Sequence, residues 1–168
     1  WKLGDLPKGY DHKYIYSHAG YNMKITDMQA ACGLAQVNRV EEFIKSRKSN
    51  FKYIYDSLKS HEEFLILPQA TENSDPSWFG FPITLRENLS ISRTELLRHL
   101  DKKKIGTRLL FSGNATKQPY MLKKKFKIVG DLVNTSNIMN NTFWIGVYPG
   151  LTHLQLDFVT DQIKFFFK

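Results

Sequence analysis

Thr26-Asp27-Met28-Gln29 has the residue pattern of a helix N-terminus, in which the Thr hydroxyl and the Gln side chain each bond a free backbone N–H group. Apolar residues then recur at spacings of three, four or seven, which is the stripe of an amphipathic helix. The stripe consists of Leu34, Val37, Val40, Ile44, Phe51, Ile54 and Leu58. The pattern predicts one long helix over residues 26–60, on the order of 50 Å in length at 1.5 Å per residue. A helix of this length rarely serves one small domain, so we expect it to connect two.

Shorter elements are predicted after the long helix. Ser92 and Glu95 form a second capping box, and Thr152 is placed to cap a last helix. The predicted strands are 64–67, 78–84, 105–111 and 143–147, and the predicted helices are 92–103, 135–141 and 152–167, with a loop over 112–130. This order favours an α/β layer, in which a sheet of three or four strands has its helices on one face.

Composition excludes several classes of protein. The chain has 168 residues, of which 42% are hydrophobic, so a core can form and disorder is excluded as the main state. The single cysteine, Cys32, excludes a disulfide framework and a cysteine cluster held by this chain alone. No apolar run approaches the ~20 residues that a membrane-spanning helix needs.

The net charge of +8 is concentrated in one segment, because residues 102–130 contain nine basic residues and no acidic one. Such a segment is typical of a site for nucleic acid, a membrane surface or a phosphorylated small molecule, or of a solvated loop. Lysine outnumbers arginine, and no zinc-finger spacing or helix-turn-helix pattern is present, so the sequence argues against nucleic acid.

Motifs for self-contained catalysis are missing from the sequence. There is no phosphate-binding glycine loop, and Ser112-Gly113 lacks the flanking residues of a serine nucleophile turn. His12 and His18 have no convincing further ligands for a metal ion. Motifs alone therefore predict an α/β domain of unknown activity, with no metal site.

Two longer stretches carry a resemblance to a known family. Residues 20–31, Gly-Tyr-Asn-Met-Lys-Ile-Thr-Asp-Met-Gln-Ala-Ala, resemble a motif of the DegT/DnrJ/EryC1/StrS sugar aminotransferases, which use pyridoxal phosphate on nucleotide sugars. Residues 107–119, Thr-Arg-Leu-Leu-Phe-Ser-Gly-Asn-Ala-Thr-Lys-Gln-Pro, look like one branch of it, the CDP-4-keto-6-deoxyglucose 3-dehydrases of deoxysugar and O-antigen synthesis. Segments 9–14, 77–82 and 139–150 match the same branch, so the resemblance covers essentially the whole chain.

The resemblance implies the C-terminal part of a pyridoxal-phosphate-dependent type I aminotransferase-like fold. Residues 1–25 would form an active-site and dimer-contact loop, residues 26–60 the long interdomain helix, and residues 61–168 the small domain. The large cofactor-binding domain would be absent, so we expect this chain alone to be inactive. The parent enzyme would be a cytoplasmic homodimer, with no nucleic acid or membrane as partner.

The resemblance also implies site residues. Asn22 and Lys24 would bind the phosphate of pyridoxal phosphate or pyridoxamine phosphate. The nucleotide-sugar substrate would be bound by Arg108, Asn114, Lys117 and His18. Arg108 suits a diphosphate because a guanidinium group binds such anions in a fork. Four of these residues also have a structural alternative: a turn for Asn22, a turn-stabilising role for His18, a surface lysine for Lys24 and a sheet-surface arginine for Arg108.

The parent of this branch would hold an iron–sulfur cluster of the 2Fe–2S type and receive electrons from a flavin or iron–sulfur reductase. The cluster cysteines would lie upstream of Trp1, and Cys32 does not match one of them. Two alternatives remain, a nucleotide-sugar 4-aminotransferase of the same family and a non-catalytic dimerisation or binding module. Related aminotransferases usually carry a His-Tyr segment where this chain has residues 110–114, which favours the dehydrase.

Overall fold

The computed structural model describes residues 21, 23–87, 89–121 and 124–167. The chain divides into two compact units, residues 1–38 and residues 39–168. Each unit is described by itself below.

The first unit contains helix α1 (Asp27–Val37), which begins at the predicted capping box. The Thr26 hydroxyl accepts a hydrogen bond from the Gln29 N–H at 3.3 Å, and the Gln29 side chain accepts one from the Thr26 N–H at 2.9 Å. α1 contains no buried residue, although Met28 and Leu34 are apolar. Its apolar side chains therefore have no packing partner within the described part of the first unit.

The predicted long helix is interrupted at Asn38 and Arg39. α2 (Val40–Leu58) begins there and continues into a 3₁₀ turn, η2 (Lys59–His61). One continuous helix over residues 26–60 is therefore a wrong prediction, although both halves are helical. The Asn38 N–H bonds the Gln36 carbonyl instead of the carbonyl four residues earlier. Asparagine favours such local alternatives to the helix, because its short polar side chain can compete for nearby backbone groups. The role of this segment as an interdomain connection stays a prediction.

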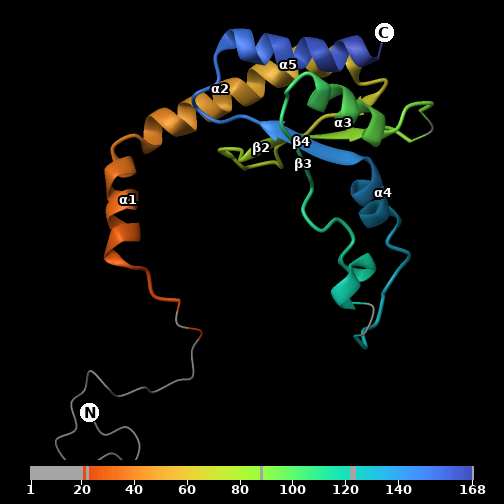
Figure 1. The fold of residues 1–168 in the computed structure, drawn as a ribbon, viewed down its shortest axis with the longest axis horizontal. Coiled ribbons are helices and arrows are strands. Elements are labelled where there is room, and N and C mark those ends of the chain that lie inside the picture. The colour runs from red at the N-terminus through yellow and green to blue at the C-terminus, as the bar shows by residue number, and fades with distance from the viewer. Residues whose placement is uncertain (1–20, 22, 88, 122–123, 168) are drawn as a thin grey trace, which may run out of the picture. The chain divides into compact units, whose positions relative to one another are not determined.

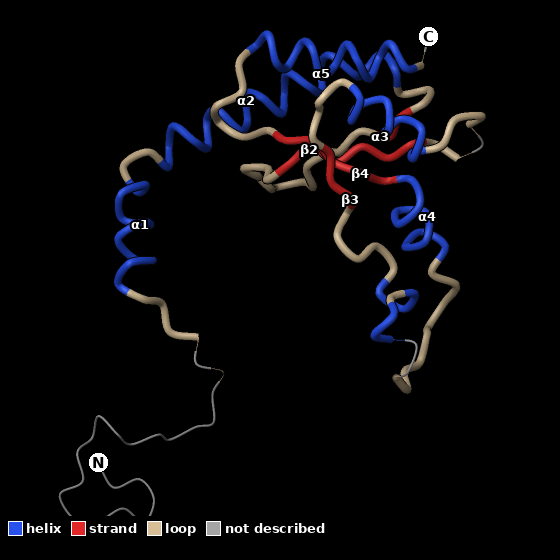
Figure 2. Tube along the Cα trace, in the orientation of Figure 1, coloured by secondary structure: helices blue, strands red, loops and turns tan. Residues whose placement is uncertain are grey.

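The second unit is built on a four-stranded antiparallel sheet, which agrees with the predicted three or four strands, whose directions the sequence did not predict. Its strands are β1 (Leu65–Ile66), β2 (Gly80–Leu85), β3 (Thr107–Leu109) and β4 (Thr142–Gly146), in the spatial order β1-β2-β4-β3 (Figure 2). Phe81 on β2 lies opposite Ile145 on β4, and Ile83 lies opposite Phe143. Each strand alternates its side chains between the two faces, so this register places all four apolar side chains on one face.

That face is covered by three helices, which confirms the prediction of helices on one side. α2, α3 (Arg93–Lys102) and α5 (His153–Phe166) lie over it, with α2 and α5 side by side (Figure 1). The helices bury their apolar stripes against the sheet, as the predicted periodicity required. The helical contribution to the core is Ile54, Leu58, Leu96, Leu100, Leu156 and Ile163, each at most 2% exposed.

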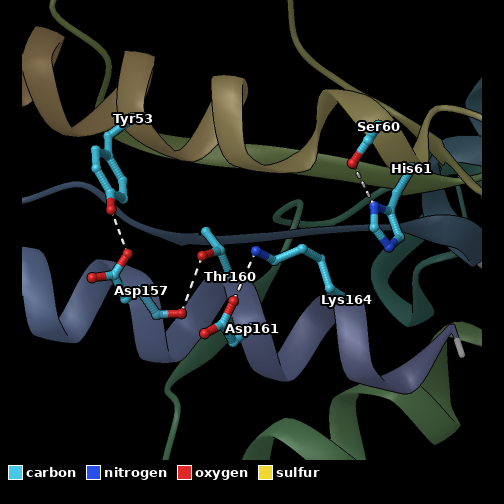
Figure 3. Close-up of polar contacts among 7 residues, drawn as sticks. All are labelled: Tyr53, Ser60, His61, Asp157, Thr160, Asp161 and Lys164. Carbon is cyan, nitrogen blue, oxygen red and sulfur yellow. Dashed lines mark hydrogen bonds and ion pairs between the residues drawn. The ribbon is translucent and has the colours of Figure 1, made fainter.

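Polar contacts join α2 to α5 at the edge of the core (Figure 3). The Tyr53 hydroxyl donates to the Asp157 carboxylate, and this bond, helped by the carboxylate's charge, raises the pKa of Tyr53. Along α5, the Thr160 hydroxyl donates to the Asp157 carbonyl at 3.1 Å, and Lys164 pairs with Asp161 at 2.7 Å. Because the Tyr53–Asp157 contact between the two helices lies in an exposed position, it orients them more than it stabilises them.

The opposite face of the sheet carries small residues where an aromatic ring needs room. Gly80 on β2 faces Trp144, whose ring carbon Cε3 would lie only 2.4 Å from a Cβ atom added at Gly80. The Trp144 indole N–H donates to the Leu109 carbonyl at 3.1 Å, which holds the ring in place. Glycine at position 80 is therefore a packing requirement.

We predict that Gly80→Ala lowers the free energy of unfolding by about 1–3 kcal/mol, because the added methyl group displaces the Trp144 ring. Gly106→Ala is the matched control, since a Cβ atom there meets nothing within 4 Å. Urea unfolding measures both variants. Equal stability of the two would contradict the packing argument.

The capping box of α3 predicts a pH-dependent contribution to stability. The backbone and side chain of Ser92 both donate to Glu95 at 2.7 Å, which lowers the pKa of Glu95 below its ordinary value of 4.5. A lowered pKa in the folded state stabilises the fold above the unfolded-state value, and this contribution is lost as the pH falls through the folded-state value. In Glu95→Gln the amide oxygen can still accept but does not titrate.

We therefore expect the stability difference between the wild type and Glu95→Gln to be largest near pH 7 and to shrink as the pH falls below about 4.5. Urea midpoints from pH 7 to pH 3 measure this difference. The other carboxylates are common to both proteins, so their contributions to the pH dependence cancel in the difference. A difference that does not change with pH would refute the role of the Glu95 charge.

Candidate functional site

The segment that runs from β3 to β4 contains three of the predicted site residues. After β3 the chain runs away from the sheet, passes through two 3₁₀ turns and returns through α4 (Val133–Asn141) to β4 (Figure 1). The 3₁₀ turns are η3 (Ala115–Lys117) and η4 (Pro119–Met121). Arg108 lies on β3, Asn114 caps η3, and Lys117 ends η3.

Asn114 is buried, with 2% of its surface exposed. Its amide nitrogen donates to the Ser136 hydroxyl on α4 at 3.2 Å. Its amide oxygen accepts from the Thr116 N–H at 3.1 Å and from the Thr116 hydroxyl at 2.6 Å. In this conformation both ends of the amide are engaged inside the protein, so the structure gives Asn114 a role in shaping the loop. Direct binding of substrate by Asn114 stays a prediction.

Two backbone positions next to Asn114 adopt left-handed conformations. Gly113 has φ +60°, and a Cβ atom there would lie 2.6 Å from Cγ of Met139 on α4. Phe111 has φ +48°, although it is not a glycine and its ring is 80% exposed. A bulky residue in this region costs on the order of 1–3 kcal/mol, and such a conformation persists only where its surroundings hold it.

Arg108 is exposed on the sheet face opposite the core. It lies directly across from Trp144 in the register of β3 and β4, and Trp144 lies across from Pro82 on β2. Residues paired in this way share a face, so the Arg108 side chain and the Trp144 ring belong to the same surface of the sheet. This surface carries one cation beside an aromatic ring.

Arg93 holds α4 against the sheet. Its guanidinium group donates to the Met139 carbonyl at 2.6 Å and to the Thr142 carbonyl at 3.0 Å, at the C-terminal end of α4. Burial lowers the pKa of Arg93 from its ordinary value. Because α4 in turn contacts the loop that carries Asn114, Arg93 links the core helix α3 to the candidate site.

The remaining predicted site residues are divided between the two units. Lys24 lies in the first unit, just before α1, and is exposed, as is Lys117 in the second unit. Asn22 and His18 lie outside the described residues. The structure therefore brings Arg108, Asn114 and Lys117 into one segment and leaves the combination with Lys24 untested.

The described residues contain no group of three His, Cys, Asp or Glu side chains that could hold a metal ion. Among the helices of the described ranges, none combines the length and the apolar character that a bilayer crossing needs. Of the predicted site residues in the second unit, Arg108 and Lys117 are cations, and this donor chemistry fits phosphate groups. This segment thus suits part of a phosphorylated ligand.

An apolar cavity of about 460 Å³ lies elsewhere in the second unit, between α5 and the ends of β3 and β4. Its polar side chains are Lys104, Tyr148 and Gln155, and the other side chains in its wall are apolar. Without converging polar groups it lacks the features that orient a phosphorylated substrate.

Sequence reasoning missed three residues that shape this site: Arg93, Phe111 and Ser136. The Ser112-Gly113 pair was a usable signal for Phe111, since glycine after a loop aromatic marks a sharp turn. Arg93 and Ser136 gave no signal, because their partners are brought close only by the fold.

Residues 5–164 match the sequence model of the DegT/DnrJ/EryC1/StrS aminotransferase family. The chain belongs to this family. The match includes both stretches on which the resemblance was based, and it leaves only a few residues at each end.

Among the relatives of this aminotransferase-family chain is the lipopolysaccharide biosynthesis protein RfbH of Salmonella typhimurium, 63% identical over 99% of this chain and 38% of its own length. Another is the dTDP-4-dehydro-2,6-dideoxy-D-glucose 3-dehydratase of Saccharopolyspora spinosa, 44% identical over 99% of this chain and 36% of its own length. The chain thus spans less than two fifths of the length of these curated relatives.

Solved structures confirm the predicted fold. The structure of E. coli GDP-4-keto-6-deoxy-D-mannose-3-dehydratase with bound hydrated PLP superposes with a TM-score of 0.82 at 23% identity, over 94% of this chain and 40% of that one. An aminotransferase from Psychrobacter cryohalolentis superposes equally well, with a TM-score of 0.82 at 19% identity, over 97% of this chain and 43% of that one. The family chain therefore has the fold of part of a sugar aminotransferase or dehydratase.

We predict that Arg93→Ala lowers the free energy of unfolding by about 1.5–3 kcal/mol, because two carbonyl groups lose a charged donor. Arg98→Ala, on an exposed position of the same helix, is the control and should change it by about 0.5 kcal/mol or less. Thermal or urea unfolding measures both. A loss no larger than that of the control would show that Arg93 does not anchor α4.

Proposed function

We propose that this chain is the C-terminal portion of a nucleotide-sugar 3-dehydrase, dependent on pyridoxal or pyridoxamine phosphate, that acts on CDP-4-keto-6-deoxyglucose in deoxysugar and O-antigen synthesis. The observation that carries the proposal is the 63% identity with RfbH over 99% of this chain. The 44% identity with a nucleotide-sugar 3-dehydratase supports the reaction type.

The cofactor phosphate would be held by Asn22 and Lys24. The exposed ammonium group of Lys24 and the amide of Asn22 are donors of the kind that bind phosphate oxygens. When bound, the cofactor supplies the electron sink that expulsion of the C3 hydroxyl of the sugar requires. This chain contributes binding and orientation, and the catalytic groups belong to the rest of the parent protein.

The diphosphate of the nucleotide sugar would be bound by Arg108. Its guanidinium fork suits two phosphate oxygens at once, and its position on the open face of the sheet leaves it accessible. Lys117 adds a second cation on the same segment, and His18 would be a further substrate-binding residue. Asn114 supports this segment through Ser136 and remains a candidate for contact with substrate.

The parent protein would work as a cytoplasmic homodimer and receive electrons from a flavin or iron–sulfur reductase through a 2Fe–2S cluster outside this chain. The exposed apolar residues of the first unit support a protein contact. Tyr21, Met23 and Met28 are 93%, 88% and 79% exposed, which is unusual for large apolar side chains so close in sequence.

A nucleotide-sugar 4-aminotransferase is the alternative within the family. The residue at the Schiff-base position of the full-length protein separates the two, since lysine favours transamination and histidine favours the dehydrase. A non-catalytic dimerisation or binding module is the third candidate.

We expect the full-length protein, with pyridoxamine phosphate and a reductase, to convert CDP-4-keto-6-deoxyglucose to the 3-deoxy sugar. In Arg108→Gln the KM should rise about tenfold or more while kcat stays within about twofold, because a ground-state contact to the diphosphate is lost. Steady-state kinetics and product analysis measure both.

Lys125→Gln removes one charge from another exposed part of the basic segment and is the control for Arg108→Gln. The 168-residue chain alone should show no stoichiometric cofactor absorbance. An amino sugar as the product would favour the aminotransferase, and the absence of any turnover of nucleotide sugars would refute the proposed function.

A further inference from the structure

The loop after β3 presents an aromatic ring outward on a strained backbone. Phe111 is 80% exposed and has φ +48°. Burial of its own ring does not compensate for this conformation, because the ring faces solvent. Strained positions of this kind are found at ligand-binding sites, where the surrounding structure holds a side chain ready.

The surrounding contacts hold this loop at several points. The Phe111 N–H bonds the Leu109 carbonyl at 2.8 Å, and the Gly113 N–H bonds the Leu110 carbonyl at 3.1 Å. The Gln118 side chain donates to the Ser112 carbonyl at 2.8 Å. The loop is therefore closed on itself on both sides of the exposed ring.

Asn114 attaches the closed loop to α4. It is the buried residue of this loop, and its amide connects Thr116 within the loop to Ser136 on the helix. Gly113 packs on Met139, one helical turn after Ser136, so loop and helix touch at two neighbouring points. Loss of the Asn114 amide would leave the Gly113–Met139 contact between loop and helix, and it would remove the two bonds that Thr116 donates to Asn114.

We propose that Phe111 is a substrate contact that packs its ring face on a ring of the nucleotide sugar, and that Asn114, through Ser136, is the positioning residue that holds it there. This inference rests on the proposed function, since it names a contact for the same substrate. Arg108 lies three residues before Phe111, so one segment offers a cation for the diphosphate and a ring face beside it. A flat apolar face suits either the base or the sugar ring.

The test uses the full-length enzyme and CDP-4-keto-6-deoxyglucose. Phe111→Ala and Phe111→Leu should raise KM about fivefold or more with kcat within about twofold, while Phe111→Tyr, which keeps the ring, should stay within about twofold of the wild type. Phe165→Ala on α5 is the matched control, because that ring is also exposed, at 64%. Inhibition by CDP alone shows whether Phe111 packs on the base or on the sugar ring. Weaker inhibition of Phe111→Ala indicates the base, and unchanged inhibition indicates the sugar ring.

Asn114→Ala should raise KM in the same direction and should speed amide hydrogen exchange across residues 110–118. Asn137→Ala is its control, because among the described residues the Asn137 side chain bonds within α4, where it accepts from Asn141 at 2.6 Å. The effects of Asn114→Ala and Phe111→Ala on KM should be less than additive, since one acts through the other.

An unchanged KM in folded Phe111→Leu overturns the proposal, and so does a loss of thermal stability without a change in KM, which would place the ring against the rest of the protein. If Phe111→Ala does not fold, the comparison of Phe111→Leu with Phe111→Tyr decides. A wild-type enzyme with no turnover of nucleotide sugars refutes the proposed function instead, and hydrogen exchange then still shows whether Asn114 orders the loop.

Discussion

The pairing of β2 with β4 is the constraint on which the second unit depends. Its register sets Phe81 against Ile145 and Ile83 against Phe143 on one face, where α2, α3 and α5 cover them. A shift by one residue would turn every one of these side chains toward solvent, so the hydrophobic core and the register specify each other. The same register determines which side chains lie on the other face of the sheet, where Trp144 lies between Pro82 and Arg108. The candidate site is thus a consequence of how the core is packed.

A second set of contacts connects the core to the loop after β3. Arg93 leaves the core helix α3 and binds the end of α4, and α4 receives Asn114 through Ser136. Without these contacts, the bonds described for the loop after β3 would be its own short-range ones, around a residue, Phe111, at a positive φ. Tertiary contacts that begin in the core therefore help to hold the strained backbone of Phe111.

Sequence periodicity predicted the helices and strands of the second unit well, because their apolar residues follow the periods of the buried faces. The capping boxes at Thr26, Ser92 and Thr152 were readable for the same reason, since each depends on residues only three apart. The break at Asn38 was not, because the apolar stripe runs through it without a change of spacing. The role of Asn114 inside the loop could not be predicted either, since Ser136 is 22 residues away in the sequence.

Once the fold is known, the basic residues of segment 102–130 fall into groups with different surroundings. Lys102 lies in the last turn of α3, Lys103 caps that helix, and Lys104 follows with φ +62°. Cations at the C-terminus of a helix are stabilised by its unpaired carbonyl groups, so these three charges have a local structural use. Arg108, on β3, and Lys117, at the end of the single 3₁₀ turn η3, lie instead on either side of the Phe111 loop. The positive charge that we propose for a phosphorylated ligand is therefore this smaller pair, and the three lysines at the end of α3 have a separate structural explanation.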